Sequence, residues 1–356
     1  MPTTASPSAA TTANFAERQQ YYSRIGAEHL APLWERLHKL VTRIPASPAL
    51  AHKWDYSSQI RPLLLEAGSL ITAQEAERRV LILENPGLPN QSSITHTLYA
   101  GFQLILPGEV ARAHRHSQSA LRFVVEGSGA YTAVNGEKTL MQPGDLVLTP
   151  SWRFHDHGND TRNPMIWLDG LDIPVVNLLD ASFFEPSVAE RQEISRNAGD
   201  SNARYGANML PYDWQASSRA SPLFSYPYAQ SKSALVDLQR NGEADPYHGY
   251  KLRYSNPATG AHVMPTIGAF LQLLPRGYRT APYRSTDGTV YAVVEGSGSS
   301  IIGEKRMSWK AKDVFVAPSW QPQIHIADSE SILFSFSDRP LQEMLDLWRE
   351  QRDEPS

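Results

Sequence analysis

The sequence predicts a mainly β protein that consists of two β-barrels in tandem behind an N-terminal helical segment. Short β-rich runs separated by turn signals fill residues 95–149, which is the pattern of a sandwich or barrel. The string Val-Val-Glu-Gly-Ser-Gly at 124–129 recurs at 293–298, and Pro-Ser-Trp at 150–152 recurs at 318–320. Because both strings recur in the same order at nearly one offset, they indicate a duplicated barrel.

Composition excludes several classes of protein. The 356 residues suffice for roughly two domains of about 150 residues each. A net charge of −4 argues against a nucleic-acid partner, and no apolar run reaches the ~18 residues of a membrane span. The chain has no cysteine, so disulfides and thiolate metal sites are excluded, and we expect a cytoplasmic protein without a membrane partner.

The N-terminal region is predicted to start with a tail and continue as helix. Residues 1–14 are rich in Ala, Thr, Ser and Pro and lack the basic and apolar regions of a secretory signal, so we expect a disordered tail. Residues 15–94 are predicted to form a helical segment. Its first helix has apolar residues at spacings near four from Tyr21 to Val41, and Pro45 ends it.

The remaining boundaries follow from the repeat and from loop composition. Further helical or mixed segments are predicted at 59–68 and 72–83. The first barrel is placed at 95–195 and the second at 235–356. A linker rich in Asn, Ser, Gly and Pro is predicted between them at 196–234.

Three histidines in the first barrel have the spacing of metal ligands. His114 and His116 are two residues apart on a predicted strand, so their side chains share one face. His155 follows 39 residues later on another strand that can return to the same place. Three imidazoles leave coordination positions open, which predicts a metal site that acts on a substrate.

The second barrel lacks this site. Transferring the repeat onto it places Tyr283, Ser285 and Gln323 at the three ligand positions. Only His325 is kept, and it matches His157 of the first barrel. We therefore expect metal in the first barrel alone, and a packing or oligomerisation role for the second.

Arg122 is expected to face the interior of the first barrel, by alternation from His116. A buried guanidinium needs an anion. The functional interpretation is a bidentate contact with a substrate carboxylate, and the alternative is an internal ion pair with Glu126 or Asp169. Tyr291 takes this position in the second barrel, which favours the functional interpretation.

His157, two residues after His155, is also expected to face inward. It could hydrogen-bond to bound substrate or oxygen and move a proton, or it could be structural, as its retained counterpart suggests. Asp169 could orient His157 or make only surface contacts. Arg153 is an unexpected inward-facing charge near the site.

At these residues the chain resembles the cupins, and among them the gentisate 1,2-dioxygenase family of bicupins. The first cupin motif is matched from Gly108 to His116 and the second from Gly144 to Asn159. The carboxylate ligand of many cupins, expected near Ala120, is absent, as in this family. The resemblance runs from about residue 31 to the C-terminus and implies two double-stranded β-helix (jelly-roll) barrels.

The resemblance implies an Fe(II) dioxygenase. A hydroxylated benzoate would chelate the iron beside O2, and its ring would open between the carboxyl-bearing and hydroxyl-bearing carbons. Gentisate would give maleylpyruvate, and salicylate, substituted salicylates or 1-hydroxy-2-naphthoate are the alternatives. The resemblance also implies a homotetramer.

The same resemblance implies a substrate pocket lined by Arg78, Tyr99, Gly101 and Gln103. From the residues alone, Arg78 and Arg79 could equally form a solvated helix face. Val80, where relatives tend to carry a polar residue, and the space expected at Gly101 weaken the case for gentisate itself.

Two other functions remain open from the residues. Three histidines also suit Zn²⁺, so a Zn or Mn cupin that acts as an isomerase or hydrolase is possible. A non-catalytic bicupin that binds or stores a ligand is the other alternative, although such a protein has little need of one complete triad.

Overall fold

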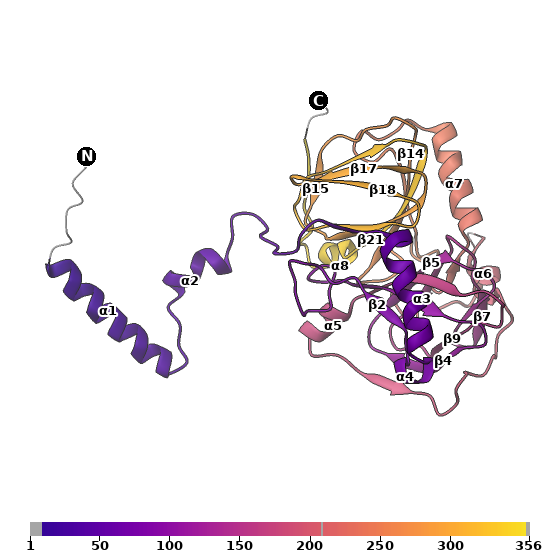
Figure 1. Ribbon diagram of the computed structural model, residues 1–356, viewed down its shortest axis with the longest axis horizontal. Coiled ribbons are helices and arrows are strands. Elements are labelled where there is room, and N and C mark those ends of the chain that lie inside the picture. Colours follow the sequence, from indigo (N-terminus) through magenta and orange to yellow (C-terminus); the bar gives the residue numbers. More distant parts are fainter. Residues whose placement is uncertain (1–8, 208, 354–356) are drawn as a thin grey trace. The chain divides into compact units, whose positions relative to one another are not determined.

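The computed structural model describes residues 9–207 and 209–353, and its contacts divide the chain into two units, Met1–Ala46 and Ser47–Ser356. The first unit contains helices α1 (Ala9–Ala27) and α2 (Leu33–Leu40) (Figure 1). Tyr22 joins them: its hydroxyl donates to Glu35 at 2.6 Å and accepts from the Trp34 indole at 2.9 Å.

The N-terminal helix differs from the prediction at both ends. It begins at Ala9, so residues 9–14 of the predicted tail are helical, while residues 1–8 lie outside the described part of the chain. The single helix predicted through Val41 is wrong, because the chain breaks between α1 and α2. Pro32 cannot donate a backbone hydrogen bond, and it disfavours the helical conformation of the residue before it.

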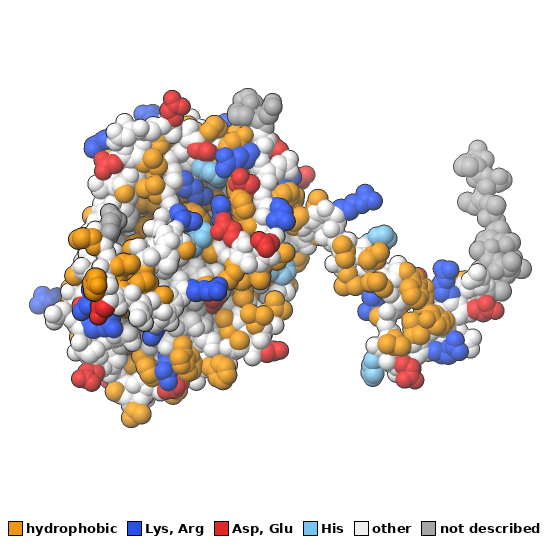
Figure 2. Space-filling view, turned by 180° about the vertical axis from the view of Figure 1, so that it is seen from behind, with side chains coloured by type: hydrophobic (Ala, Val, Ile, Leu, Met, Phe, Trp, Pro, Cys, Tyr) orange, Lys and Arg blue, Asp and Glu red, His pale blue; other side chains and the backbone are white. Residues whose placement is uncertain are grey.

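Helix α2 has an apolar face that stays exposed among the residues that the structure describes in this unit. None of its side chains is buried. Figure 2 shows hydrophobic side chains gathered on this unit, and the large exposed ones on and just after α2 are Leu33, Trp34, Leu37, Leu40, Val41 and Ile44.

The second unit consists of two barrels, each made of a six-stranded and a five-stranded antiparallel sheet (Figure 1). The first barrel contains β2 (Val80–Ile82), β3 (Tyr99–Ile105), β4 (Val110–His116), β5 (Ala120–Glu126), β6 (Tyr131–Val134), β7 (Glu137–Leu140), β8 (Leu146–Thr149), β9 (His155–Gly158), β10 (Met165–Leu171), β11 (Phe184–Pro186) and β12 (Ser225–Tyr226). The second contains β1 (His52–Trp54), β13 (Tyr250–Arg253), β14 (Gly268–Leu274), β15 (Tyr283–Ser285), β16 (Thr289–Glu295), β17 (Ser297–Ile302), β18 (Lys305–Lys310), β19 (Val314–Ala317), β20 (Gln323–Ala327), β21 (Ser331–Ser337) and β22 (Glu350–Arg352). The predicted mainly β, two-barrel architecture is confirmed.

Helices flank both barrels, and two pairs correspond: α3 and α7 precede the equivalent strands β3 and β14, and α5 and α8 follow the equivalent strands β10 and β21. They are η1 (Tyr56–Ile60), α3 (Arg61–Leu70), α4 (Ala73–Ala76), α5 (Ile173–Leu178), α6 (Asp200–Tyr205), α7 (Tyr228–Asn241) and α8 (Arg339–Met344). Among the residues described, no helix has the length and apolar character that a membrane crossing requires.

The segment that precedes each predicted barrel adds a strand to the other barrel. Strand β1 lies before the first barrel in sequence but pairs with β19 of the second, and β12 lies between the barrels and pairs with β8 of the first. The predicted helical segment at 15–94 therefore contains β1 and β2, and the predicted linker at 196–234 contains α6, β12 and the start of α7. Loop-like composition does not reveal such pairing, because an added edge strand is held mainly by backbone hydrogen bonds.

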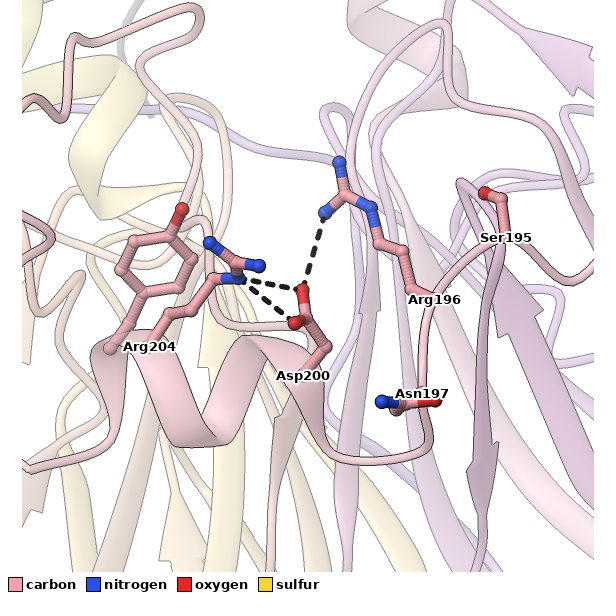
Figure 3. Close-up of a pocket in the computed structure, with 6 residues that line it drawn as sticks. Ser195, Arg196, Asn197, Asp200 and Arg204 are labelled. Carbon is pink, nitrogen blue, oxygen red and sulfur yellow. Dashed lines mark hydrogen bonds and ion pairs between the residues drawn. The ribbon is translucent and has the colours of Figure 1, made fainter.

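Part of this connecting segment borders a surface hollow. Asp200, at the start of α6, accepts from Arg204 at 2.9 Å and lies 4.0 Å from Arg196 (Figure 3). These residues line a hollow of about 400 Å³ in which both guanidinium groups are already paired.

Each of the two helical connections is bound to both barrels by one tyrosine. At the start of η1, the Tyr56 amide donates to Asp313 at 3.0 Å and its hydroxyl donates to Glu126 at 2.9 Å. The Tyr228 residue of α7 repeats these bonds with Asp145 (2.9 Å) and Glu295 (2.6 Å). The repeated Val-Val-Glu-Gly-Ser-Gly strings thus carry the glutamates that anchor the connections.

One hydrophobic core runs through both barrels. Phe123 of β5 stacks on Phe334 of β21, with ring centroids 4.0 Å apart, and both belong to one buried cluster. Strand β5 is buried along almost all its length, as expected where both faces of a sheet are covered. Because side chains alternate, Arg122 next to Phe123 points to the opposite face, into the first barrel.

Candidate metal centre

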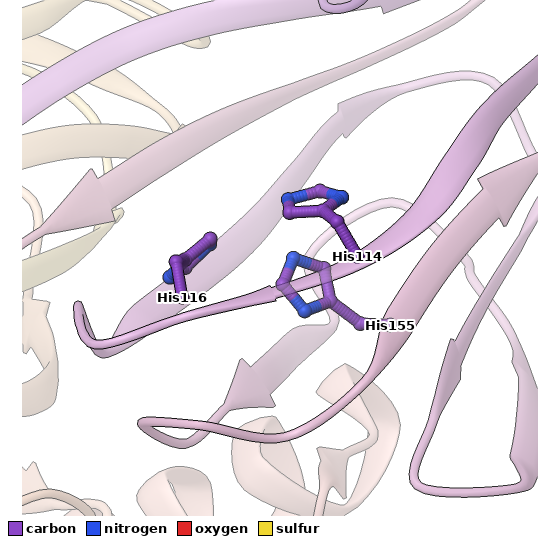
Figure 4. Close-up of side chains that lie close together, drawn as sticks. All are labelled: His114, His116 and His155. Carbon is purple, nitrogen blue, oxygen red and sulfur yellow. The ribbon is translucent and has the colours of Figure 1, made fainter. Parts of the chain in front are cut away.

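Three histidines meet inside the first barrel. His114 and His116 lie at the end of β4, and His155 begins β9, directly opposite His114 in the antiparallel register. One ring nitrogen from each histidine lies within 4.8 Å of the others. Figure 4 shows the three rings gathered between the two strands. The structure therefore brings together the three ligands expected from the spacing.

Backbone carbonyls select which ring nitrogen can bind a metal. In all three histidines Nδ1 lies within hydrogen-bond distance of a carbonyl oxygen two residues away. The acceptors are Arg112 for His114 (3.1 Å), Gln118 for His116 (2.8 Å) and Arg153 for His155 (2.9 Å). At His116 and His155 a proton on Nδ1 leaves the Nε2 lone pair free for a cation, the arrangement usual for histidine ligands. At His114 the same Nδ1 also lies 2.5 Å from the Arg78 Nη2 donor, so the carbonyl alone does not fix the position of the proton.

The surroundings keep these rings neutral. Burial lowers the pKa of His114 to about 3 and that of His116 to about 4. Burial also lowers the pKa of His155, and the positive charge of Arg122 adds to the effect. A neutral imidazole is the form that binds a divalent cation, so the donor set fits a metal.

The metal site is absent from the second barrel, and the strand register shows how. Tyr283 lies opposite Gln323, as His114 lies opposite His155. The position equivalent to Arg122 is Tyr291, whose hydroxyl donates to Gln323 at 2.8 Å. A hydrogen bond between Tyr291 and Gln323 thus occupies the place that Arg122 and His155 have in the first barrel.

Arg78 and Arg79 have different surroundings. Both follow α4, and the solvated helix face foreseen for them is wrong. Arg79 is buried in an ion pair with Glu109 at 2.8 Å. Arg78 is half-buried; its Nη2 donates to the Arg112 carbonyl at 2.7 Å and lies 2.5 Å from His114 Nδ1. Burial lowers the Arg78 pKa to about 10, a value at which the group stays charged near neutral pH.

Arg122 is buried next to Asp169. Its Nη1 donates to Thr149, and its Nε lies 3.5 Å from Asp169 Oδ1 without a hydrogen-bond partner among the described residues. The alternative partner foreseen, Glu126, is bound by Arg61 at 2.8 Å instead. Burial raises the pKa of Asp169 to about 6, and Arg122 opposes this rise.

His157 has one partner and one free nitrogen. Its Nδ1 lies 2.9 Å from the Thr132 hydroxyl, and its buried Nε2 has no partner within the part of the chain that is described. Of the two roles considered for Asp169, neither the orientation of His157 nor a surface contact is found: neither ring nitrogen of His157 bonds to Asp169, which is buried and accepts from the Trp167 indole at 3.0 Å. Sequence reasoning missed Thr132, which lies outside both motifs, and Thr149, which lies in the second motif at a position whose residue type the motif does not specify.

The predicted pocket residues of β3 lie on a strand paired with β10. Gln103 is buried, and Tyr99 is half-buried with a pKa raised by burial. The extra space expected at Gly101 is not present. A Cβ atom there would lie 2.6 Å from Val80 Cγ1 and 3.0 Å from the Tyr99 hydroxyl.

A cavity of about 940 Å³ leads to His114. Arg78, Arg112 and Phe184 are among the residues that line it. The Phe184 ring lies 5.3 Å from the His114 ring, on a strand that sequence reasoning did not predict. Of the residues predicted to contact substrate, Arg78 lines this cavity and Tyr99, Gln103, Arg122 and His157 do not.

Known proteins share these features. A cupin-domain family model matches residues 101–171. Gentisate 1,2 dioxygenase 1 of Aquipseudomonas alcaligenes is 56% identical over 337 residues, which cover 95% of this chain and 97% of that protein. The chain belongs to the gentisate 1,2-dioxygenase family. It is therefore a ring-cleaving dioxygenase with the cupin fold, and the resemblance stated from the motifs is confirmed.

Other members of the family differ in the substrates that their names give. The 5-aminosalicylate 1,2-dioxygenase of Comamonas sp is 36% identical over 328 residues, which cover 91% of this chain and 87% of that protein. The crystal structure of salicylate 1,2-dioxygenase from Pseudoaminobacter salicylatoxidans with gentisate superposes with a TM-score of 0.89 at 36% identity, covering 99% of this chain and 96% of that one.

Proposed function

We propose that this dioxygenase depends on Fe(II) and opens the ring of a 2-hydroxybenzoate, with gentisate as the preferred substrate and maleylpyruvate as the product. The observation that carries the proposal is the convergence of three neutral histidines in one barrel only. The relative with 56% identity over nearly the whole chain, named a gentisate dioxygenase, supports the choice of substrate.

His114, His116 and His155 would hold the iron through their Nε2 atoms. Bound Fe(II) would supply open coordination positions at which the hydroxy acid and O2 come together. Because all three protein ligands are neutral, they leave the positive charge of the ion for an anionic substrate to compensate.

Arg122 would hold the substrate carboxylate. Its Nε has no hydrogen-bond partner, and its guanidinium is buried, so a carboxylate would replace lost hydration with charge-assisted bonds. Asp169 would act as a positioning residue, because its 3.5 Å contact limits where the guanidinium can lie. Arg78 adds a second positive charge at the edge of the site.

His157 would accept the proton of the substrate hydroxyl at Nε2. This nitrogen is buried and unpaired, and burial lowers the pKa of the ring so that it is neutral and able to accept. His325 in the second barrel makes the same kind of bond, to Ser300 at 2.7 Å, which is why a purely structural role is the alternative.

Salicylate or a 5-substituted salicylate is the second candidate substrate. Val80 places a methyl group against Gly101, and an apolar group there offers no partner to the 5-hydroxyl of gentisate. The relative named a 5-aminosalicylate dioxygenase supports this alternative.

Oxygen uptake by the Fe(II)-loaded protein tests the proposal. Gentisate, salicylate, 5-aminosalicylate and 1-hydroxy-2-naphthoate would be compared, with the absorbance of ring-opened product as a second signal. The rate of oxygen uptake is expected to be highest with gentisate. Absence of uptake with every one of these acids, together with Zn or Mn in the purified protein, would favour the isomerase or hydrolase instead.

We also propose a homotetramer. The uncovered apolar face of α2 and exposed apolar residues near α5, namely Leu178, Leu179, Phe183 and Phe184, are surfaces that a subunit contact could bury. Light scattering after size-exclusion chromatography measures the mass. A cytoplasmic location stays a prediction from composition.

A further inference from the structure

The second barrel retains a cavity at the place that matches the metal centre of the first. Its volume is about 520 Å³, within the usual range of small-molecule sites. Tyr283, Ser285 and Gln323, the residues at the three ligand positions, all line it. A barrel that served only for packing would be filled by close-packed side chains, so the presence of this cavity indicates a role other than packing.

The most unusual residue of this cavity is Lys251. It lies on β13 opposite Gln272, and the equivalent pair in the first barrel is Val80 opposite Gln103. At this equivalent position the first barrel therefore has the apolar side chain of Val80, and the second has the ammonium group of Lys251. Within the described residues, no ion pair and no hydrogen bond holds the Lys251 ammonium.

The carboxylates of the cavity already have donors. Asp287 accepts from the Trp348 indole at 3.0 Å. Glu350 accepts from the Tyr283 hydroxyl at 3.1 Å and pairs with Arg352 at 3.2 Å. Among the described residues, Lys251 and Arg253 are the cations of this lining that lack a contacting counter-ion, and Arg253 already donates to the Gly260 carbonyl at 2.8 Å.

Burial makes that charge unfavourable unless an anion joins it. The pKa of Lys251 is lowered to about 8 by burial, against the influence of Asp287, so most molecules still carry the charge at neutral pH. Lys251 is only partly buried, and its ammonium group has lost part of its hydration without gaining a counter-ion, so a bound anion would stabilise the charge.

The rest of the lining suits an organic anion. Four aromatic rings line the cavity, those of Phe270, Tyr283, Tyr291 and Trp348. The Lys251 ammonium lies 5.0 Å from the centre of the Phe270 ring, so charge and apolar surface adjoin. A cation, hydroxyl groups and ring faces together recognise a carboxylate attached to a small carbon skeleton.

We propose that the cavity of the second barrel binds a small organic carboxylate through an ion pair with Lys251. Both an aromatic acid and an acyclic acid formed by ring opening have this chemistry, and the test distinguishes them. The proposal goes beyond the proposed function and does not require the first barrel to be active.

Calorimetric titration of the full-length protein tests the proposal. The two probes are 4-bromobenzoate and maleate, which lack the ortho-hydroxyl of a hydroxybenzoate. Because their carboxylates can still bind a metal in the first barrel, the Lys251→Met variant is needed to assign binding to the second barrel. At least one probe should bind, and the Lys251→Met substitution should raise the Kd of that probe tenfold or more. Lys305→Met is the matched control, because this lysine is exposed on β18 of the same barrel. Its Kd should equal that of the wild type.

A crystal soak gives a readout that needs no variant. With 4-bromobenzoate, the anomalous bromine signal should lie in the cavity beside Lys251. Binding of the bromobenzoate alone would indicate an aromatic ligand, and binding of maleate alone an acyclic one. The proposal is overturned if neither probe binds, if Lys251→Met binds with unchanged affinity, or if bromine lies only in the first barrel. Oxygen uptake, measured separately, tests the first barrel alone.

Discussion

Arg122 provides a test that separates substrate binding from folding. In Arg122→Met, the buried Asp169 carboxylate loses the guanidinium 3.5 Å away and keeps only the Trp167 indole as donor. Removing one member of a buried pair costs about 3–5 kcal/mol of folding free energy. The substrate carboxylate would lose charge-assisted bonds of about 1.5–3 kcal/mol, so kcat/KM should fall on the order of 10–150-fold.

The double variant Arg122→Met/Asp169→Asn distinguishes the two effects. It removes both charges, so most of the lost stability should return in urea unfolding, because no uncompensated buried charge remains. Oxygen uptake should stay low, since the group that holds the substrate is still absent. Recovery of activity in the double variant would refute the reasoning, because Arg122 would then serve only to neutralise Asp169.

Four other outcomes are expected. His116→Ala should abolish iron binding and oxygen uptake while leaving the melting temperature within a few degrees, because the second barrel folds without its counterpart; a collapsed melting curve would contradict this. Gly101→Ala should lower kcat/KM, since the new Cβ would lie 2.6 Å from Val80, and Val80→Ala should restore it; failure of that rescue would rule out the clash as the cause. Asp145→Ala should destabilise the protein in urea by about 1–3 kcal/mol, because the Tyr228 amide loses its acceptor, while a value near zero would rule out a stabilising role for this bond. In metal-free protein, stability to urea should fall as the pH drops from 6.5 toward about 4, because unfolding allows the ligand histidines, whose folded pKa values are lowered, to take up protons; a flat profile would argue against buried neutral rings.

The amino-acid sequence alone determined which residues are the candidate metal ligands. Two histidines separated by one residue on a strand share a face whatever the rest of the chain does, because side-chain direction alternates locally. The repeat then supplied an internal comparison, in which His114 and His155 became Tyr283 and Gln323 while the two glycines at 127 and 129 recur at 296 and 298. A local rule and a duplicated sequence together sufficed for the architecture and the candidate site.

Tertiary structure decided which partner each buried side chain has. Arg122 could pair with Glu126 or Asp169 in sequence, and the register of β5 against β10 placed it beside Asp169. The strand exchange of β1 and β12 and the cavity around Lys251 also lay beyond sequence reasoning. These features depend on contacts between segments far apart in the chain. Strand register and burial, rather than residue type, determine which side chains come into contact there.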